Sequence, residues 1–189
     1  MTRLFLIRHG EPEAAWGGEA DDPGLSALGR AQAEAAAATL AACGRLAILS
    51  SPMKRCRETA APFEARAGAS ATVESRVSEV AAPDGIKDRR MWLRENFPWE
   101  GSERRAWRCV DPALWAWRDN VVAAMLALKQ DSAVFSHFIA INALASTATR
   151  SADTIVCLPG YASITEFAIR DGALELVRFG EAMVRGEVR

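Results

Sequence analysis

The two histidines of the chain stand in similar surroundings. His9 follows the apolar run 4–7 and is preceded by Arg8. His137 follows the apolar run 133–135. A neutral imidazole is a nucleophile, and a protonated imidazole binds anions. Because a guanidinium group is a permanent cation, the Arg8–His9 pair places a fixed positive charge beside a potential nucleophile.

A further arginine lies where a helix is expected to begin. Residues 51–60 read SPMKRCRETA, and a helix that starts near Met53 places Arg55 in its first turn. The N-terminus of a helix carries a partial positive charge. Arg55 and this helix N-terminus are therefore predicted to hold an anion together.

The pattern of apolar runs and turn residues predicts alternating strands and helices. Short apolar runs bounded by turn residues are typical of buried strands, and long segments rich in Ala are typical of helices. Strands are expected at 4–7, 46–49, 73–80, 133–136, 163–169 and 173–179, and helices at 26–43, 53–67, 112–130 and 138–149. This order predicts an α/β fold, a three-layer sandwich with a largely parallel central sheet and helices on both faces.

Such a sheet would bring the polar residues together. In open α/β sheets, ligands bind beyond the carboxyl ends of the strands. Three polar pairs each follow a predicted strand at that end: Arg8–His9, Ser50–Ser51 and Ser136–His137. We therefore expect these pairs to line one crevice.

The composition limits the classes of partner. The chain has 189 residues, of which 50% are hydrophobic, and one domain over residues 1–189 is expected. Its 23 Lys and Arg against 24 Asp and Glu give a net charge of −1. No overall field therefore attracts nucleic acid or an acidic membrane surface, and neither partner is predicted. The sequence predicts no particular oligomeric state.

Location and metal content follow from two further patterns. The apolar run 4–7 is shorter than the core of a signal peptide, and no run is long enough to span a membrane, so the cytoplasm is the expected location. The four cysteines have no C-x-x-C spacing, and only two histidines accompany them. A zinc site needs more ligands at compatible spacing, so no metal and no cofactor are predicted.

Four motifs occur in a set order along the chain. They are R-H-G at 8–10, L-S-A-L-G-R-A-Q-A at 25–33, S-P-x-x-R-x-x-x-T-A at 51–60 and W-E-G at 99–101. Through these motifs, from residue 3 to about residue 145, the chain resembles the histidine phosphatase superfamily, also called the phosphoglycerate-mutase-like family. One position departs from the family pattern, because Phe138 follows the second histidine where glycine is usual.

The resemblance implies a reaction and assigns roles in it. His9 would be the nucleophile that forms a transient phosphohistidine. Arg8, Arg55 and His137 would bind the phosphoryl oxygens, His137 as an imidazolium. Two arginines and a histidine would thereby replace a metal ion, so activity is expected to survive a chelator.

The resemblance also implies a carboxylic acid in the loop after the third strand. Glu79, in the sequence V-S-E-V, fits this place, and Glu74 and Glu103 are its rivals. The acid would protonate the leaving oxygen and then activate the water that hydrolyses the phosphohistidine. A bound phosphate dianion would raise the pKa of this acid by like-charge repulsion.

Residues 81–110 form a candidate lid insert with an unusual composition. Five of the six tryptophans lie between residues 92 and 117, and seven Lys and Arg lie between residues 87 and 108. A lid of this kind would suit a larger phosphorylated ligand through stacking and charge. The favoured interpretation is simpler: an amphipathic helix with packed tryptophans and solvated arginines.

The predicted function is hydrolysis of small phosphate monoesters, and three alternatives stay open. A phosphoglycerate mutase needs basic residues near the site, and residues 11–24 contain no Lys or Arg. A non-catalytic phosphate-binding module would not need both histidines, both arginines and an acid. A phosphatase of phosphohistidine or phosphoserine proteins would need an exposed, shallow site.

Overall fold

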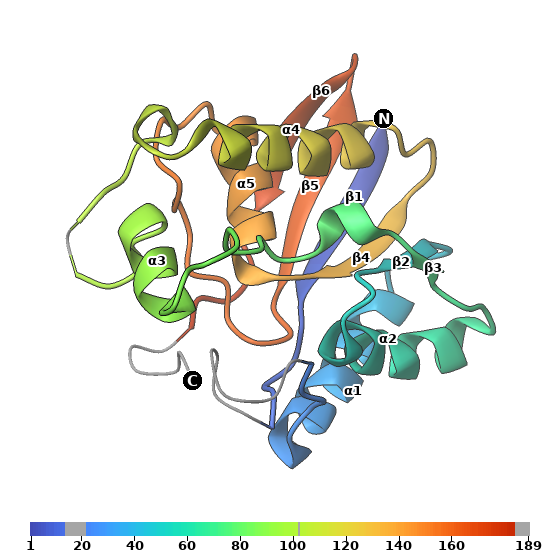
Figure 1. Cartoon of the computed structure of the whole chain (residues 1–189). Coiled ribbons are helices and arrows are strands. Elements are labelled where there is room, and N and C mark those ends of the chain that lie inside the picture. Colours follow the sequence, from blue (N-terminus) through green and yellow to red (C-terminus); the bar gives the residue numbers. More distant parts are fainter. Residues whose placement is uncertain (14–21, 102, 184–189) are drawn as a thin grey trace.

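A single six-stranded sheet forms the centre of the molecule (Figure 1). The computed structural model describes residues 1–13, 22–101 and 103–183. The strands are β1 (Thr2–Arg8), β2 (Ala47–Ser50), β3 (Thr72–Val73), β4 (Ser132–Ser136), β5 (Ile164–Arg170) and β6 (Ala173–Arg178). Their spatial order is β3-β2-β4-β1-β5-β6. The pairs β3–β2, β2–β4 and β4–β1 are parallel, whereas the pairs β1–β5 and β5–β6 are antiparallel. The α/β prediction with a largely parallel sheet is confirmed.

Helices cover both faces of this sheet (Figure 1). They are α1 (Ala27–Ala41), α2 (Lys54–Ala67), α3 (Arg89–Asn96), α4 (Pro112–Leu126) and α5 (Phe138–Ala148), with short 3-10 turns η1 (Ser75–Val77) and η2 (Trp107–Cys109). Helices α1 and α2 pack on one face, and α4 and α5 pack on the other. No helix of the described ranges is long and apolar enough to cross a bilayer.

Strand β1 shows why two apolar layers form. Successive side chains of a strand point to opposite faces. Phe5 and Ile7 join the buried cluster under α1 and α2, whereas Leu4 and Leu6 join the cluster under α4 and α5. Because both faces of β1 are covered, its apolar run is continuous rather than alternating.

The helix ends follow the sequence signals closely. The Ser26 hydroxyl accepts the N–H of Gly29 at the start of α1. Asp111 caps α4 ahead of Pro112, which occupies the first helical position. Gly68 ends α2 with φ of 62°, a left-handed conformation that glycine adopts without a Cβ clash.

Two predicted boundaries are wrong. The strand expected at 73–80 is only Thr72–Val73, because Glu74 accepts the N–H of Arg76 and starts the turn η1, which buries Val77 in the core. The helix expected to reach residue 130 ends at Leu126. The chain returns there to the sheet, where Asp131 binds the backbone and guanidinium of Arg3.

The 81–110 segment packs against α5 through a third apolar cluster. Trp99 and Trp107 are buried in it, together with Leu93 of α3, against Phe138 and Ile139. The indole N–H of Trp107 donates to Ser146 of α5 at 3.0 Å. Trp99 and Trp107 therefore pack in the core of the fold, although both lie outside the helix α3.

Candidate active site

The carboxyl ends of β1 and β4 bring the two histidines together. The backbone N–H of His9 donates to the carbonyl of Ser136 at 3.0 Å. The ring centroids of His9 and His137 lie 5.3 Å apart. Both rings are buried, with exposed fractions of 6% and 0%. The sheet thus places side by side two residues that are 128 positions apart in the sequence.

His9 is held as a neutral imidazole with one nitrogen free to react. Its Nδ1 lies 2.8 Å from the carbonyl oxygen of Gly10. A carbonyl only accepts, so Nδ1 carries the proton and Nε2 keeps its lone pair. Burial, and then the charges of Arg55 and Arg8, hold the pKa of His9 well below its ordinary value. The ring therefore stays neutral near pH 7, as a nucleophile requires.

Arg8 is a buried cation fixed beside His9. Its Nη1 donates to the carbonyl of Pro159 at 2.8 Å. Its guanidinium carbon lies 4.0 Å from the ring centroid of Tyr161 and 5.2 Å from that of Phe138. Its Nε is buried and has no hydrogen-bond partner within the described ranges. Arg8 thus keeps a donor for a further acceptor, which suits an anionic ligand.

Arg55 and His137 form a hydrogen-bonded pair in the same site as His9 and Arg8. Nη2 of Arg55 lies 3.2 Å from Nδ1 of His137. Arginine only donates, so His137 accepts at Nδ1 and donates from Nε2 to the hydroxyl of Ser51 at 2.9 Å. Burial and the charge of Arg55 hold the pKa of His137 well below its ordinary value. The hydrogen bond from Arg55 and the lowered pKa favour the neutral form of His137, whereas the imidazolium was expected beside a bound dianion.

Glu79 lies next to this pair and accepts two backbone N–H groups. Its Oε2 accepts the N–H of Ile139 at 3.0 Å, in the first turn of α5, and its Oε1 accepts the N–H of Val80 at 3.2 Å. Burial raises the pKa of Glu79, and this effect outweighs the two hydrogen bonds and the charges of Arg55 and Arg89. A raised pKa favours the protonated carboxyl, which is the form that a general acid requires.

The two rival acids are placed differently. Glu74 pairs with Arg76 through its Oε2 at 2.6 Å, and this partner holds the pKa of Glu74 below its ordinary value. Glu103 is exposed. Of the three carboxylates, Glu79 has the environment that favours the protonated form.

The loop after His9 is fixed by backbone contacts from two helices. The N–H of Gly10 donates to Oγ1 of Thr59 at 2.9 Å, and that hydroxyl donates to the carbonyl of Arg55 at 2.6 Å. Gly29 of α1 packs directly on the loop, because a Cβ added there would lie 2.1 Å from the carbonyl oxygen of Glu11. One hydroxyl therefore sets the distance between the loop after His9 and α2, and one glycine sets the distance between this loop and α1.

The model of the histidine phosphatase superfamily, branch 1, matches residues 4–182. The chain belongs to the histidine phosphatase superfamily.

Relatives within this family include named phosphatases. Glucosyl-3-phosphoglycerate phosphatase of Mycolicibacterium vanbaalenii is 35% identical over 119 residues, which are 61% of this chain and 51% of that protein. An uncharacterised protein of Mycobacterium tuberculosis is 35% identical over 117 residues, 60% of this chain and 52% of that protein. This chain therefore spans about half the length of the curated relatives it matches.

Solved structures show the same fold. The native mycobacterial glucosyl-3-phosphoglycerate phosphatase superposes with a TM-score of 0.71 at 21% identity, over 97% of this chain and 100% of that one. Its complex with inorganic phosphate gives a TM-score of 0.69 at 22% identity, over 96% of this chain and 98% of that one. At such identities the likeness shows a shared histidine phosphatase fold.

Phe138, which departs from the family pattern, has a structural role in this chain. Phe138 is buried, and one face of its ring lies over the guanidinium of Arg8. The ring also joins the apolar cluster that holds the 81–110 segment. Phe138 therefore covers a site arginine and points into the core.

Sequence reasoning missed Tyr161 and Asp22, and it counted Arg89 only among the basic residues of the candidate lid. Tyr161 is the one tyrosine of the chain, and its ring lies 5.8 Å from that of His9. Arg89, the first residue of α3, donates from Nη2 to the carbonyl of Val80, and its charge acts on Glu79. Asp22 accepts the N–H of Lys54. Only the rarity of tyrosine was a usable signal, because arginine and aspartate are common on surfaces.

Asp22 also changes the prediction about the helix N-terminus. Both of its carboxylate oxygens lie 2.9 Å from the N–H of Lys54, the first residue of α2. The end of α2 that was expected to hold an external anion with Arg55 is thus occupied by a carboxylate of the chain itself.

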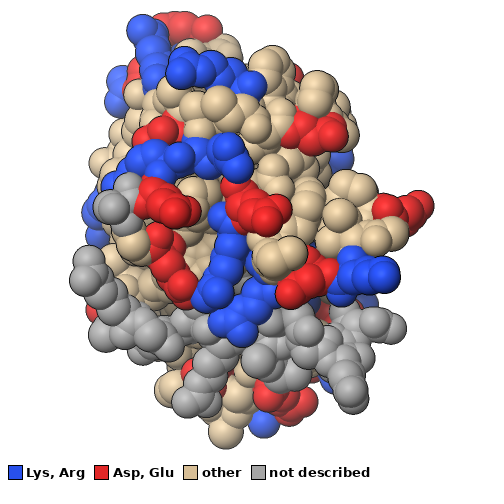
Figure 2. Space-filling model, turned by 60° about the vertical axis from the view of Figure 1, so that its left-hand side comes forward, with Lys and Arg blue, Asp and Glu red and all other residues tan. Residues whose placement is uncertain are grey.

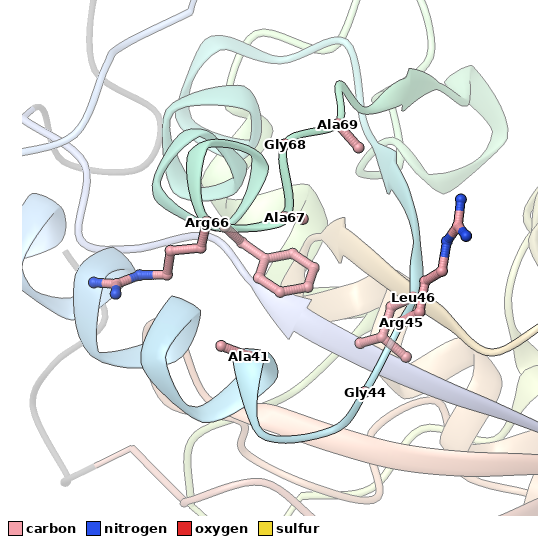
Figure 3. A pocket seen from close by; sticks show the side chains of 9 residues that line it. Ala41, Gly44, Arg45, Leu46, Arg66, Ala67, Gly68 and Ala69 are labelled. Atoms are coloured by element: carbon pink, nitrogen blue, oxygen red, sulfur yellow. The ribbon is translucent and has the colours of Figure 1, made fainter.

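A pocket of about 360 Å³ lies at the other end of α2 (Figure 3). It is lined by Ala41, Gly44, Arg45, Leu46, Phe63, Arg66, Ala67, Gly68 and Ala69. The two arginines point away from each other, and Arg66 pairs with Glu34 at 2.8 Å. Ala67 lies twelve residues after Arg55, or about 18 Å along the helix. This pocket is therefore separate from the histidine pair.

On one face of the molecule, acidic side chains surround a group of basic side chains. Figure 2 shows Lys and Arg gathered in the middle of that face with Asp and Glu around them. Within residues 1–13, 22–101 and 103–183, no three His, Cys, Asp or Glu side chains come together as a metal ion would require.

Proposed function

We propose that this protein is a phosphatase that hydrolyses phosphate monoesters through a phosphohistidine on His9. One observation carries the proposal. The Nδ1 proton of His9 is fixed on Gly10, so Nε2 presents a lone pair in a ring that Arg8 and Arg55 help to keep neutral. A buried neutral nucleophile between two cations suits attack on a phosphoryl dianion.

The reaction has two steps at one phosphorus atom. Nε2 of His9 attacks phosphorus, the bond to the ester oxygen breaks, and the protonated carboxyl of Glu79 gives its proton to that oxygen. Water then attacks the phosphohistidine, Glu79 takes a proton from it, and inorganic phosphate leaves with His9 regenerated. Arg8 and Arg55 stabilise the phosphoryl oxygens in both steps, and His137 accepts a hydrogen bond from Arg55 at 3.2 Å and thereby helps to orient it. No metal takes part in this mechanism.

The leaving group that fits this site carries a negative charge. Glu79 marks the side of the leaving oxygen, and the charge of Arg89 acts on Glu79 from the start of α3. A carboxylate on the leaving group would therefore approach a cation. The M. vanbaalenii relative is named glucosyl-3-phosphoglycerate phosphatase. We propose small cytoplasmic phosphate esters of the phosphoglycerate type as substrates.

Trapping the phosphorylated enzyme tests the proposal. The protein is mixed with a ³²P-labelled small phosphate ester and quenched in alkali, where phosphohistidine survives and phosphoserine does not. We expect label on the wild type and none on the His9→Asn variant, with turnover unchanged by EDTA. Label that persists in His9→Asn, or EDTA inhibition that a divalent metal reverses, would overturn the mechanism.

A second assay separates the proposed phosphatase from a mutase. With 3-phosphoglycerate, a phosphatase releases inorganic phosphate and a mutase forms 2-phosphoglycerate. Arg89→Gln should lower kcat/KM for 3-phosphoglycerate more than for p-nitrophenyl phosphate, whose leaving group has no carboxylate. The neighbouring exposed Arg90→Gln is the matched control and should leave the ratio unchanged.

A further inference from the structure

The phosphate-binding arginine Arg55 has a carboxylate beside it. Oδ1 of Asp22 lies 3.7 Å from Nη1 of Arg55. The same carboxylate accepts the N–H of Lys54 at the positive end of α2. Asp22 therefore lies where both the helix N-terminus and an arginine attract an anion.

Arg55 faces two groups with its two terminal nitrogens. Nη2 lies 3.2 Å from His137 within the site, while Nη1 lies near Asp22. The Arg55 side chain is 8% exposed, so burial and these contacts restrict its movement, whereas Asp22 is 41% exposed. A phosphate dianion that binds Arg55 would approach the Asp22 carboxylate, and like charges at this range repel each other.

We propose that Asp22 is a built-in anion that weakens the binding of phosphate and thereby speeds release of the product. This inference rests on the proposed function. The site holds two buried arginines, which favour a dianion strongly, and inorganic phosphate must leave in every cycle. Binding energy that is equal for substrate, transition state and product gives no gain in turnover. The carboxylate of Asp22 beside Arg55 removes part of this binding energy, which substrate, transition state and product share.

Direct binding of inorganic phosphate tests the inference without turnover. Asp22→Asn removes the charge and keeps an oxygen that can accept the N–H of Lys54. Calorimetry at low ionic strength should give a Kd for phosphate that is lower than the wild-type value by roughly threefold to tenfold. The difference should shrink at about 0.5 M NaCl, because salt screens charge repulsion. Asp22→Ser, which also keeps a capping oxygen, should behave in the same way.

Glu58→Gln is the matched control. Glu58 is a neighbouring carboxylate that accepts the N–H of Leu25 at 2.6 Å and lies 3.8 Å from Nζ of Lys54. Its removal should leave the Kd for phosphate unchanged. Equal or weaker phosphate binding by both Asp22 variants would overturn the inference. A wild-type protein that binds no phosphate at millimolar concentration would instead overturn the proposed function itself.

Discussion

Replacing Glu79 with glutamine separates proton donation from structure. Glutamine has nearly the same shape and keeps an oxygen that can accept the N–H of Ile139, which Glu79 now accepts at 3.0 Å. The first turn of α5, and with it His137, should therefore keep its place. The amide cannot give up a proton as an acid, so the chemical role is removed together with one hydrogen bond, the weaker one from the N–H of Val80 at 3.2 Å.

The size of the loss should depend on the leaving group. A general acid typically contributes about 10²–10⁴-fold when the leaving oxygen is strongly basic. Glu79→Gln should therefore lower kcat/KM by about that factor for glycerol phosphate, an alkyl ester. For p-nitrophenyl phosphate the leaving anion is stable without a proton, so kcat/KM should fall by less than about tenfold.

The second step gives an independent signal. Hydrolysis of the phosphohistidine needs Glu79 as a base with either substrate, so the variant should accumulate phosphorylated enzyme. Stopped-flow measurement with p-nitrophenyl phosphate should show a burst of about one nitrophenol per enzyme. The control is Glu74→Gln, which removes the rival carboxylate that pairs with Arg76, and which should retain wild-type kinetics.

The reasoning is refuted if Glu79→Gln lowers kcat/KM equally for both esters and shows no burst. Glu79 would then act only through its hydrogen bonds to Val80 and Ile139.

Three further predictions concern the contacts of the loop after His9 and the two buried histidines of the chain. Thr59→Val removes the hydroxyl that accepts the N–H of Gly10 at 2.9 Å. The free energy of unfolding measured in urea should fall by about 1–3 kcal/mol and kcat should fall as well, whereas Thr59→Ser should keep the wild-type stability and kcat. Gly29→Ala should lower the melting temperature despite its gain of about 1 kcal/mol in helix propensity, because the new Cβ would lie 2.1 Å from the carbonyl oxygen of Glu11; an unchanged or higher melting temperature would contradict this. Burial lowers the pKa of both histidines, so the unfolded chain binds more protons below about pH 6.5. The free energy of unfolding should fall as pH drops below that value, by at most about 1.4 kcal/mol per histidine per pH unit, and a constant value between about pH 7.5 and 5.5 would contradict this.

The order of elements and the family could be read from the sequence because each depends on local patterns. Continuous apolar runs indicate strands that are covered on both faces, and the capping residues Ser26 and Asp111 mark the helix starts. The R-H-G motif at 8–10 placed the nucleophile directly after a buried strand. The parallel sheet then required that His9 and His137 follow strand ends at the same edge.

Local patterns failed where a long-range contact decided the outcome. The strand expected at 73–80 gave way to η1 because Val77 packs in the core and Ser136 donates to its carbonyl at 2.7 Å. The imidazolium expected at His137 depends on its neighbours, and only the folded structure places Arg55 against its Nδ1.

The sequence by itself determined the fold class and the family, and it singled out His9, Arg8, Arg55 and His137 as candidate site residues, because motif spacing and apolar periodicity are local properties. Tertiary structure alone decided the charges around that set. Asp22 is 33 positions from Arg55, and Arg89 is 34 positions from it. Electrostatic interactions depend on distance in space and on burial, which no spacing along the chain records.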